Sequence, residues 1–225
     1  MKKGNMYEGV VTWNPLGGEC PHKCIYCSSH KFMRYPEFAK KYSGVLRIDE
    51  KQINRKFKPG STVFVVGQND LFANDVPIEF IQNIIHNCKQ NNVTYFFQTK
   101  NTDRLYDFDY MLPLNSIICT TIESNDKHCV YDGIVLHPVD RVKYFSKIKN
   151  VAQKQVTIEP IMKFDLRKFV DLIEICNPYQ VNIGANSYKK VQLPEPTKKE
   201  ILSLISELEK FTIVKKKSNL ERLLK

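Results

Sequence analysis

The sequence predicts an α/β protein: a partial (β/α)6 TIM-like barrel of parallel strands that is laterally open. Short apolar, β-branched runs alternate with longer amphipathic stretches, as expected for repeated βα units and a parallel sheet. Six such units can be recognised, which is too few for a closed barrel of eight strands. The 225 residues are enough for one domain with a substantial core.

The expected strands share a short apolar run, and a polar segment follows each of them. Parallel strands deliver their carboxyl ends to one rim, where chemistry collects in βα architectures, so these six polar ends predict a pocket. The expected strands are 9–13, 62–66, 94–97, 117–121, 155–158 and 180–183.

The expected helices carry apolar residues at helical spacing, and two of them have recognisable starts. Asp75 followed by Pro77 predicts a capped first turn, and Thr197 with Glu200 has the spacing of a capping box. The expected helices are 48–57, 77–91, 140–151, 166–175 and 197–211. We expect one domain over 1–214 and a solvated basic tail over 215–225.

Composition narrows the setting of the protein. The sequence contains no apolar run near the roughly 20 residues of a membrane span and no secretion signal, so we expect a cytoplasmic protein without a membrane partner. In a reducing compartment, the seven cysteines are expected to be thiols or metal ligands. The net charge of +10 fits a phosphate-bearing partner, but a coding bias toward lysine explains it equally well.

The strongest chemical signal is a CxxxCxxC motif directly after the first expected strand, formed by Cys20, Cys24 and Cys27. Three thiolates in one tight loop can hold three irons of a 4Fe–4S cluster and leave the fourth iron without a protein ligand. The alternative is a zinc site completed by His22 or His30. Zinc motifs usually have a second, distant pair of ligands, which this sequence lacks, so the spacing favours the cluster.

The other four cysteines are scattered along the chain. Cys88 and Cys176 fall on apolar helix faces and are expected to pack in the core. Cys119 lies in the fourth expected strand and Cys129 in a loop, and the sequence leaves open whether either takes part in a reaction. No second cluster motif is visible in the sequence.

The motif and its surroundings resemble the radical S-adenosylmethionine (SAM) superfamily, in which an aromatic residue precedes the third cysteine, as Tyr26 does here. More narrowly, the chain resembles a phage- and prophage-associated radical SAM family over roughly residues 7–187. The segments that carry this resemblance are Thr12-Trp13-Asn14-Pro15, Asp70-Leu71-Phe72, Val76-Pro77, Gln98-Thr99-Lys100, Arg104-Leu105, Glu123, Asp140-Arg141-Val142 and Glu159-Pro160. One departure is Asn186, where a glutamate would often stand.

The resemblance implies two cofactors, a 4Fe–4S cluster and SAM, and a set of contacts to them. It implies that Asp70 binds the methionine ammonium group, for which a carboxylate is suited. It places Thr121 and Glu123 at ribose- and methionine-contacting positions, and Gln98 and Lys100 near the methionine carboxylate or the substrate. The alternative for each is a strand-end polar group satisfied by backbone or water. The full set of expected cofactor contacts is Tyr26, Gly67, Gln68, Asn69, Asp70, Gln98, Lys100, Thr121, Glu123 and Glu159.

The resulting hypothesis is an enzyme that cleaves SAM reductively to a 5′-deoxyadenosyl radical, which abstracts hydrogen from a substrate. The electron would come from an external donor such as flavodoxin or ferredoxin. Basic charge and the phage association favour a nucleobase, nucleotide or nucleic acid as substrate, with a peptide or small metabolite as the alternative. A competing class is a non-catalytic zinc- or cluster-containing nucleic-acid binding module. It should show basic residues interleaved with exposed aromatics, and the sequence indicates only diffuse lysines.

Overall fold

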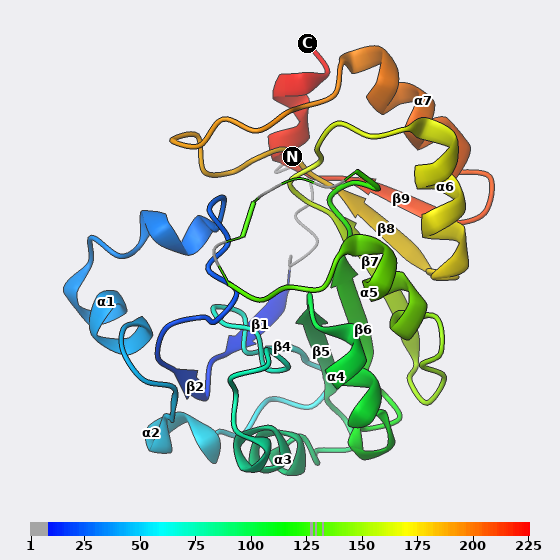
Figure 1. The fold of residues 1–225 in the computed structure, drawn as a ribbon. Helices are drawn as coiled ribbons and strands as arrows, with labels where there is room; N and C mark the ends of the chain where they lie inside the picture. The colour runs from blue at the N-terminus through cyan, green and yellow to red at the C-terminus, as the bar shows by residue number, and fades with distance from the viewer. Residues whose placement is uncertain (1–8, 127, 129, 132) are drawn as a thin grey trace.

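Seven parallel strands form one curved, open sheet, which confirms the predicted fold class (Figure 1). The computed structural model describes residues 9–126, 128, 130–131 and 133–225. The strands follow each other across the sheet in chain order, and each pairs in parallel with the next. They are β1 (Val10–Trp13), β4 (Thr62–Val65), β5 (Thr94–Thr99), β6 (Ile117–Thr121), β7 (Gln153–Ile158), β8 (Gln180–Ile183) and β9 (Ile213–Lys216).

Helices cover the outer side of this sheet (Figure 1). Each longer helix buries an apolar face against the strands. In the sixth helix, Phe169, Leu172 and Ile173 recur at helical spacing and are all buried. These covering helices are α3 (Ile78–Asn87), α4 (Thr102–Asp107), α5 (Pro138–Phe145), α6 (Leu166–Ile175) and α7 (Lys198–Leu208), with a short 3₁₀ turn η2 (Asp109–Met111) after α4.

The two predicted helix starts have different outcomes. At α7, Thr197 and Glu200 form the capping box in full, so that prediction is confirmed. At α3, the N-cap position falls on Pro77, which leaves Asp75 outside the cap, so that prediction is wrong. The proline takes this place because its fixed φ and missing N–H suit a helix start.

A long excursion between β1 and β4 carries the cysteine motif. It contains a small antiparallel pair, β2 (Leu16–Gly17) with β3 (Arg47–Ile48). Between these strands lie η1 (Ser28–Lys31) and α1 (Pro36–Tyr42), and α2 (Glu50–Ile53) follows β3. Gly18 has a φ of +94°, and a Cβ there would lie 2.4 Å from the carbonyl oxygen of Val45. Only glycine fits this turn, so the cysteine loop leaves β2 along a fixed path.

The C-terminal residues are part of the domain, contrary to the expected tail over 215–225. Lys215 and Lys216 lie in β9, an edge strand that the sequence analysis did not anticipate. A 3₁₀ turn η3 (Ser218–Leu223) follows, and its Leu220 is fully buried in the core. Burial of this leucine explains why the lysine run is held against the sheet. None of the helices in the described ranges has the length and apolar character needed to cross a membrane.

Candidate active site

A cavity of about 500 Å³ opens at the carboxyl ends of the parallel strands, the edge where βα folds place their chemistry. The cysteine loop lines one side, and residues from the last three strands line the other. The expected site residues that line it are Cys20, Cys24, Tyr26, Cys27, Gly67, Gln68, Asn69, Asp70, Gln98, Lys100, Thr121 and Glu159. Residues that line it without having been expected there include Ser29, Lys217 and Asn219.

The cysteine loop is held to the segment that follows β6. The N–H of Ile25 donates to the carbonyl oxygen of Val130 at 3.1 Å, and Cys24 forms an antiparallel bridge with Tyr131. Within the loop, the N–H of Cys27 donates to the carbonyl oxygen of Cys24 at 3.0 Å. These contacts fix the backbone, so all three thiols face one cavity.

The thiols lie in an environment that suits a bound cation. Burial, followed by the charge of Asp70, raises the pKa of Cys20 to about 12. Burial likewise raises the pKa of Cys24 to about 11, although Lys100 opposes the shift. Cysteines in such a place stay protonated by themselves, and a metal centre removes the proton by supplying positive charge.

The three thiols that line the cavity have the donor chemistry of an iron–sulfur site. Among the described residues, no three side chains of His, Cys, Asp or Glu converge closely enough to hold one metal ion. A 4Fe–4S cluster places each cysteine on a different iron, so its ligands surround a larger volume than those of one zinc ion. Three thiols around an open cavity meet that requirement, with no fourth protein ligand needed.

Neither histidine proposed for a zinc site is well placed to serve. The Nε2 atom of His22 lies 2.8 Å from Asp70 Oδ2, and its Nδ1 atom lies 3.2 Å from the carbonyl oxygen of Ile134. Both ring nitrogens of His22 are therefore engaged. His30 places Nε2 at 3.1 Å from the carbonyl oxygen of Cys24, and its ring stacks on Tyr188 with centroids 5.4 Å apart.

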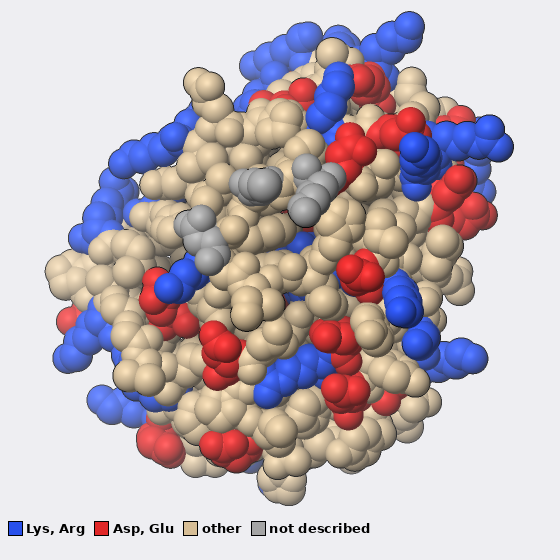
Figure 2. All heavy atoms as spheres, in the orientation of Figure 1, with Lys and Arg blue, Asp and Glu red and all other residues tan. Residues whose placement is uncertain are grey.

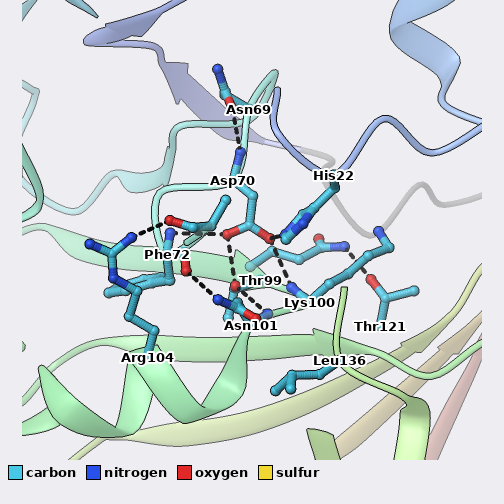
Figure 3. Close-up of polar contacts among 12 residues, drawn as sticks. His22, Asn69, Asp70, Phe72, Thr99, Lys100, Asn101, Arg104, Thr121 and Leu136 are labelled. Atoms are coloured by element: carbon cyan, nitrogen blue, oxygen red, sulfur yellow. Dashed lines mark hydrogen bonds and ion pairs between the residues drawn. The ribbon is translucent and has the colours of Figure 1, made fainter. Parts of the chain in front are cut away.

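Asp70 is the centre of a buried hydrogen-bond network at the ends of β4 and β5 (Figure 3). Its carboxylate accepts from Thr99 Oγ1 at 2.7 Å and from the N–H groups of Phe72 and Lys100 at 3.0 and 2.8 Å, besides the contact with His22. Burial raises the pKa of Asp70, but His22 and these hydrogen bonds outweigh it and the pKa is lowered. The carboxylate thus fastens the cysteine loop to the sheet, and its expected contact with the methionine ammonium stays a prediction.

Glu123 lies behind the cavity wall, and the described lining of the cavity does not include it. Its carboxylate pairs with Arg141 at 2.8 Å, and accepts a hydrogen bond from Tyr131 at 2.6 Å and a short one from Tyr26. Burial opposes ionisation, but Arg141 and Lys100 outweigh it and the pKa of Glu123 is lowered. Glu123 and Arg141 both belong to segments that carry the family resemblance, and here they form a fully buried ion pair. The expected contact of Glu123 with SAM stays a prediction.

Lys100 places a half-buried positive charge beside the cysteine loop. Its Nζ atom lies 5.6 Å from the centre of the Tyr26 ring. Burial lowers the pKa of Lys100, but Cys24 and Glu123 outweigh that effect and the pKa is raised. Lys100 therefore stays protonated, with its charge directed at the site of the thiols.

The opposite end of the cavity is built from the ends of β7, β8 and β9. Glu159 there forms an ion pair with Lys217 and accepts a hydrogen bond from Asn219 Nδ2 at 2.7 Å. Asn219 also donates to Ser187 Oγ at 2.8 Å. Sequence reasoning missed Lys217 and Asn219 because it assigned their segment to a solvated tail.

Comparison with known proteins supports the fold. No family model matches the chain, and no curated protein matches it. The solved structures that match include a variant of spore photoproduct lyase with dinucleoside spore photoproduct: TM-score 0.59 and 13% identity, covering 90% of this chain and 75% of that one. A second variant of that enzyme, with bound AdoMet and dinucleoside spore photoproduct, matches with TM-score 0.53 and 14% identity, covering 88% and 61%.

Methylornithine synthase (PylB) also matches, with TM-score 0.52 and 12% identity, covering 91% of this chain and 63% of that one. The chain therefore spans between about three fifths and three quarters of the length of these enzymes. Both enzymes are radical SAM enzymes. At these identities the likeness establishes a shared fold, the open parallel barrel, and the activity has to be argued from the site.

Proposed function

We propose that this chain is a radical SAM enzyme that holds a 4Fe–4S cluster through Cys20, Cys24 and Cys27. The observation that carries the proposal is that these three cysteines, spaced CxxxCxxC, line one cavity at the carboxyl ends of an open parallel barrel. A cluster held in this way supplies a strong one-electron reductant beside an iron that SAM can bind, which allows reductive cleavage of SAM to a 5′-deoxyadenosyl radical.

The residues around the cysteines have roles that follow from their contacts. Asp70 and His22 fix the loop that carries the cysteines. Lys100 supplies a positive charge that offsets the negative charge of thiolates in a buried place. Tyr26, held by Glu123, closes the wall behind Cys24 and excludes water from it.

For SAM, the expected contacts that remain on the cavity side are the ends of β4, β5 and β6. Gly67 lies close to the neighbouring strand, since a Cβ there would come within 3.0 Å of Thr12 Cγ2. Gln68 and Gln98 present amide groups to the cavity, where they would bind the methionine and ribose ends. Gln98 Nε2 already donates to Thr121 Oγ1 at 3.2 Å, so the two side chains act together.

For the substrate, we propose a nucleobase, nucleotide or nucleic acid, with an external one-electron donor such as flavodoxin or ferredoxin. The net charge of +10 supports a phosphate-bearing substrate. The likeness to an enzyme that was solved with a dinucleoside photoproduct is consistent with this class. Glu159, Lys217 and Asn219 line the same cavity as the cysteines and supply both donors and acceptors at its wall.

Anaerobic reconstitution with iron and sulfide, followed by a SAM-cleavage assay under a strong reductant, tests the proposal. We expect release of 5′-deoxyadenosine from the wild-type protein and none from Cys24→Ala. Cys176→Ala is the matched control, because Cys176 is also a buried cysteine but lies at the end of α6, outside the cavity lining. Stoichiometric zinc with no SAM cleavage would instead support the non-catalytic binding module.

A further inference from the structure

An exposed strip of alternating basic and aromatic side chains lies directly after the cysteine loop. Every residue from 31 to 37 is exposed, including the large apolar side chains of Phe32 and Tyr35, which are 42% and 49% exposed. Lys31 and Arg34 alternate with them along the chain. We call Lys31, Phe32, Arg34 and Tyr35 the basic–aromatic strip.

The strip does not pack into the core of the domain. None of the residues of α1, all of which the structure describes, is buried. Phe32 packs on Phe38, and Phe38 on Tyr42, with centroids 5.5 and 4.6 Å apart, so the aromatic rings support one another on the surface. Exposed apolar clusters of this kind mark sites of interaction with another molecule.

Two contacts join the residues just before the strip to the mouth of the cavity. Ser29 Oγ donates to Gln68 Oε1 at 2.9 Å, which ties the chain two residues ahead of Lys31 to the cavity wall. The ring of His30 packs on Tyr188, from the loop after β8. That loop continues with Lys189 and Lys190, both exposed, so it adds two basic side chains next to the tyrosine that His30 contacts.

The charge of this region is strongly unbalanced. Residues 28–43 contain four basic side chains and one acidic side chain, Glu37. Lys and Arg side chains gather along the edge of the molecule that α1 occupies (Figure 2). Arg34 lies over the Tyr35 ring at 4.9 Å, an arrangement that holds a flat cation next to a flat apolar surface. The surface is therefore complementary to a chain that carries both phosphates and exposed rings.

We propose that the basic–aromatic strip docks a single-stranded nucleic acid and presents one of its nucleotides to the cavity. Unpaired bases stack on exposed aromatic side chains, while phosphates pair with neighbouring Lys and Arg. A duplex hides the faces of its bases and would use only the charges. This inference rests on the proposed function, because it names the substrate class of the same cavity.

The alternation of the strip was not recognised in the sequence, where lysines seemed diffuse. Phe32 and Tyr35 are common core residues, and only the structure shows that α1 stands away from the sheet. A non-catalytic binding module would bind nucleic acid without a catalytic cavity. Here the basic–aromatic strip lies next to the cavity that the cysteines line.

Fluorescence anisotropy with a labelled single-stranded oligonucleotide of about 12 nucleotides, on anaerobically reconstituted protein, tests the inference. We expect Phe32→Ala and Tyr35→Ala each to weaken binding by about tenfold, as loss of a stacking platform does. Replacing Lys31 and Arg34 together by Gln should reduce the slope of log K against log salt concentration by about 1.4, the effect of two lost phosphate contacts.

Matched controls separate the strip from general effects. Tyr110→Ala removes an aromatic side chain that is 73% exposed on η2, and Lys199→Gln removes an exposed charge on α7. Both should bind the oligonucleotide within about twofold of the wild type. Thermal melts followed by circular dichroism confirm that the variants of the strip remain folded.

Two results would overturn the inference: wild-type oligonucleotide affinity in both aromatic variants, or loss of binding to phosphatidylserine vesicles alone in those variants. The proposed function is tested separately, by measuring release of 5′-deoxyadenosine from the wild-type protein without any substrate. Binding through the strip without SAM cleavage would reject the proposed chemistry and keep the docking surface. SAM cleavage without such binding would do the reverse.

Discussion

The Nε2 atom of His22 and the Oδ2 atom of Asp70 lie 2.8 Å apart in a part of the cavity wall that excludes solvent. His22 belongs to the cysteine loop, and Asp70 follows β4, so this contact joins two segments that are 48 positions apart in sequence. The geometry of the thiols therefore depends on a carboxylate that is not itself a ligand. Residues that do not bind a metal themselves commonly hold its ligands in the correct orientation.

Asp70→Ala should lower the free energy of unfolding by roughly 3 kcal/mol, because it leaves several buried donors without their acceptor. Urea denaturation measures the change. Asp75→Ala is the control: Asp75 is exposed and lies outside the cap of α3, so its loss should cost less than about 0.5 kcal/mol. Equal stability of the two variants would show that the network around Asp70 contributes little.

Arg141→Leu should cost roughly 3–5 kcal/mol, because it leaves the Glu123 carboxylate buried without a counter-ion. Adding Glu123→Gln to this variant should recover part of that loss, since the uncompensated charge is then gone. Denaturation of the two single variants, Arg141→Leu and Glu123→Gln, and of the double variant gives the coupling energy between the two side chains. Lys143→Leu, at an exposed position of the same helix α5, should be near neutral.

Lys100→Gln should make the reduction potential of the bound cluster more negative. A positive charge beside the cluster favours the reduced form by about 1–3 kcal/mol at an effective dielectric constant near 20, or roughly 40–130 mV for one electron. Spectroelectrochemical titration measures the potential. Lys100→Arg keeps the positive charge, so its reduction potential should stay close to that of the wild type. An unchanged reduction potential in Lys100→Gln would show that the charge of Lys100 does not act on the cluster.

Stability in acid should depend on Glu200 at the start of α7. Hydrogen bonds from Lys163 and from Thr197 lower the pKa of Glu200 to about 2. A lowered pKa in the folded state stabilises the fold above the ordinary glutamate value of 4.5, and this contribution disappears as the pH falls toward 2. Glu200→Gln should therefore be less stable than the wild type by about 1 kcal/mol near pH 7, and the difference should vanish near pH 2. Thermal melts across this pH range provide the measurement.

Most of the fold could be predicted from local patterns in the sequence. The six expected strands appear in the sheet, and helix α6 has the expected bounds, because alternating apolar runs are local signals. Strand β9 was missed, because Lys215 and Lys216 make an edge strand look like a solvated tail. Lysine is suited to an exposed edge, and only long-range pairing with β8 reveals the strand.

The sequence allowed us to predict which residues gather at the site, but not which of their side chains pair with one another. Three cysteines spaced along one loop had to lie together, and strand-end residues such as Gln98 had to reach the same rim. By contrast, the pairing of Glu123 with Arg141 depends on how α5 packs, and no local pattern encodes it. Cys119 is buried in β6, and Cys129 lies outside the described residues.

Metal and sulfide analysis of protein purified without oxygen, combined with electron paramagnetic resonance before and after addition of SAM, shows whether the three cysteines hold a cluster with one open iron. We expect about four iron and four sulfide per chain, negligible zinc, and a reduced-cluster signal that changes when SAM binds at an iron without a protein ligand. One tightly bound zinc ion per chain, or a cluster whose signal ignores SAM, would contradict this expectation.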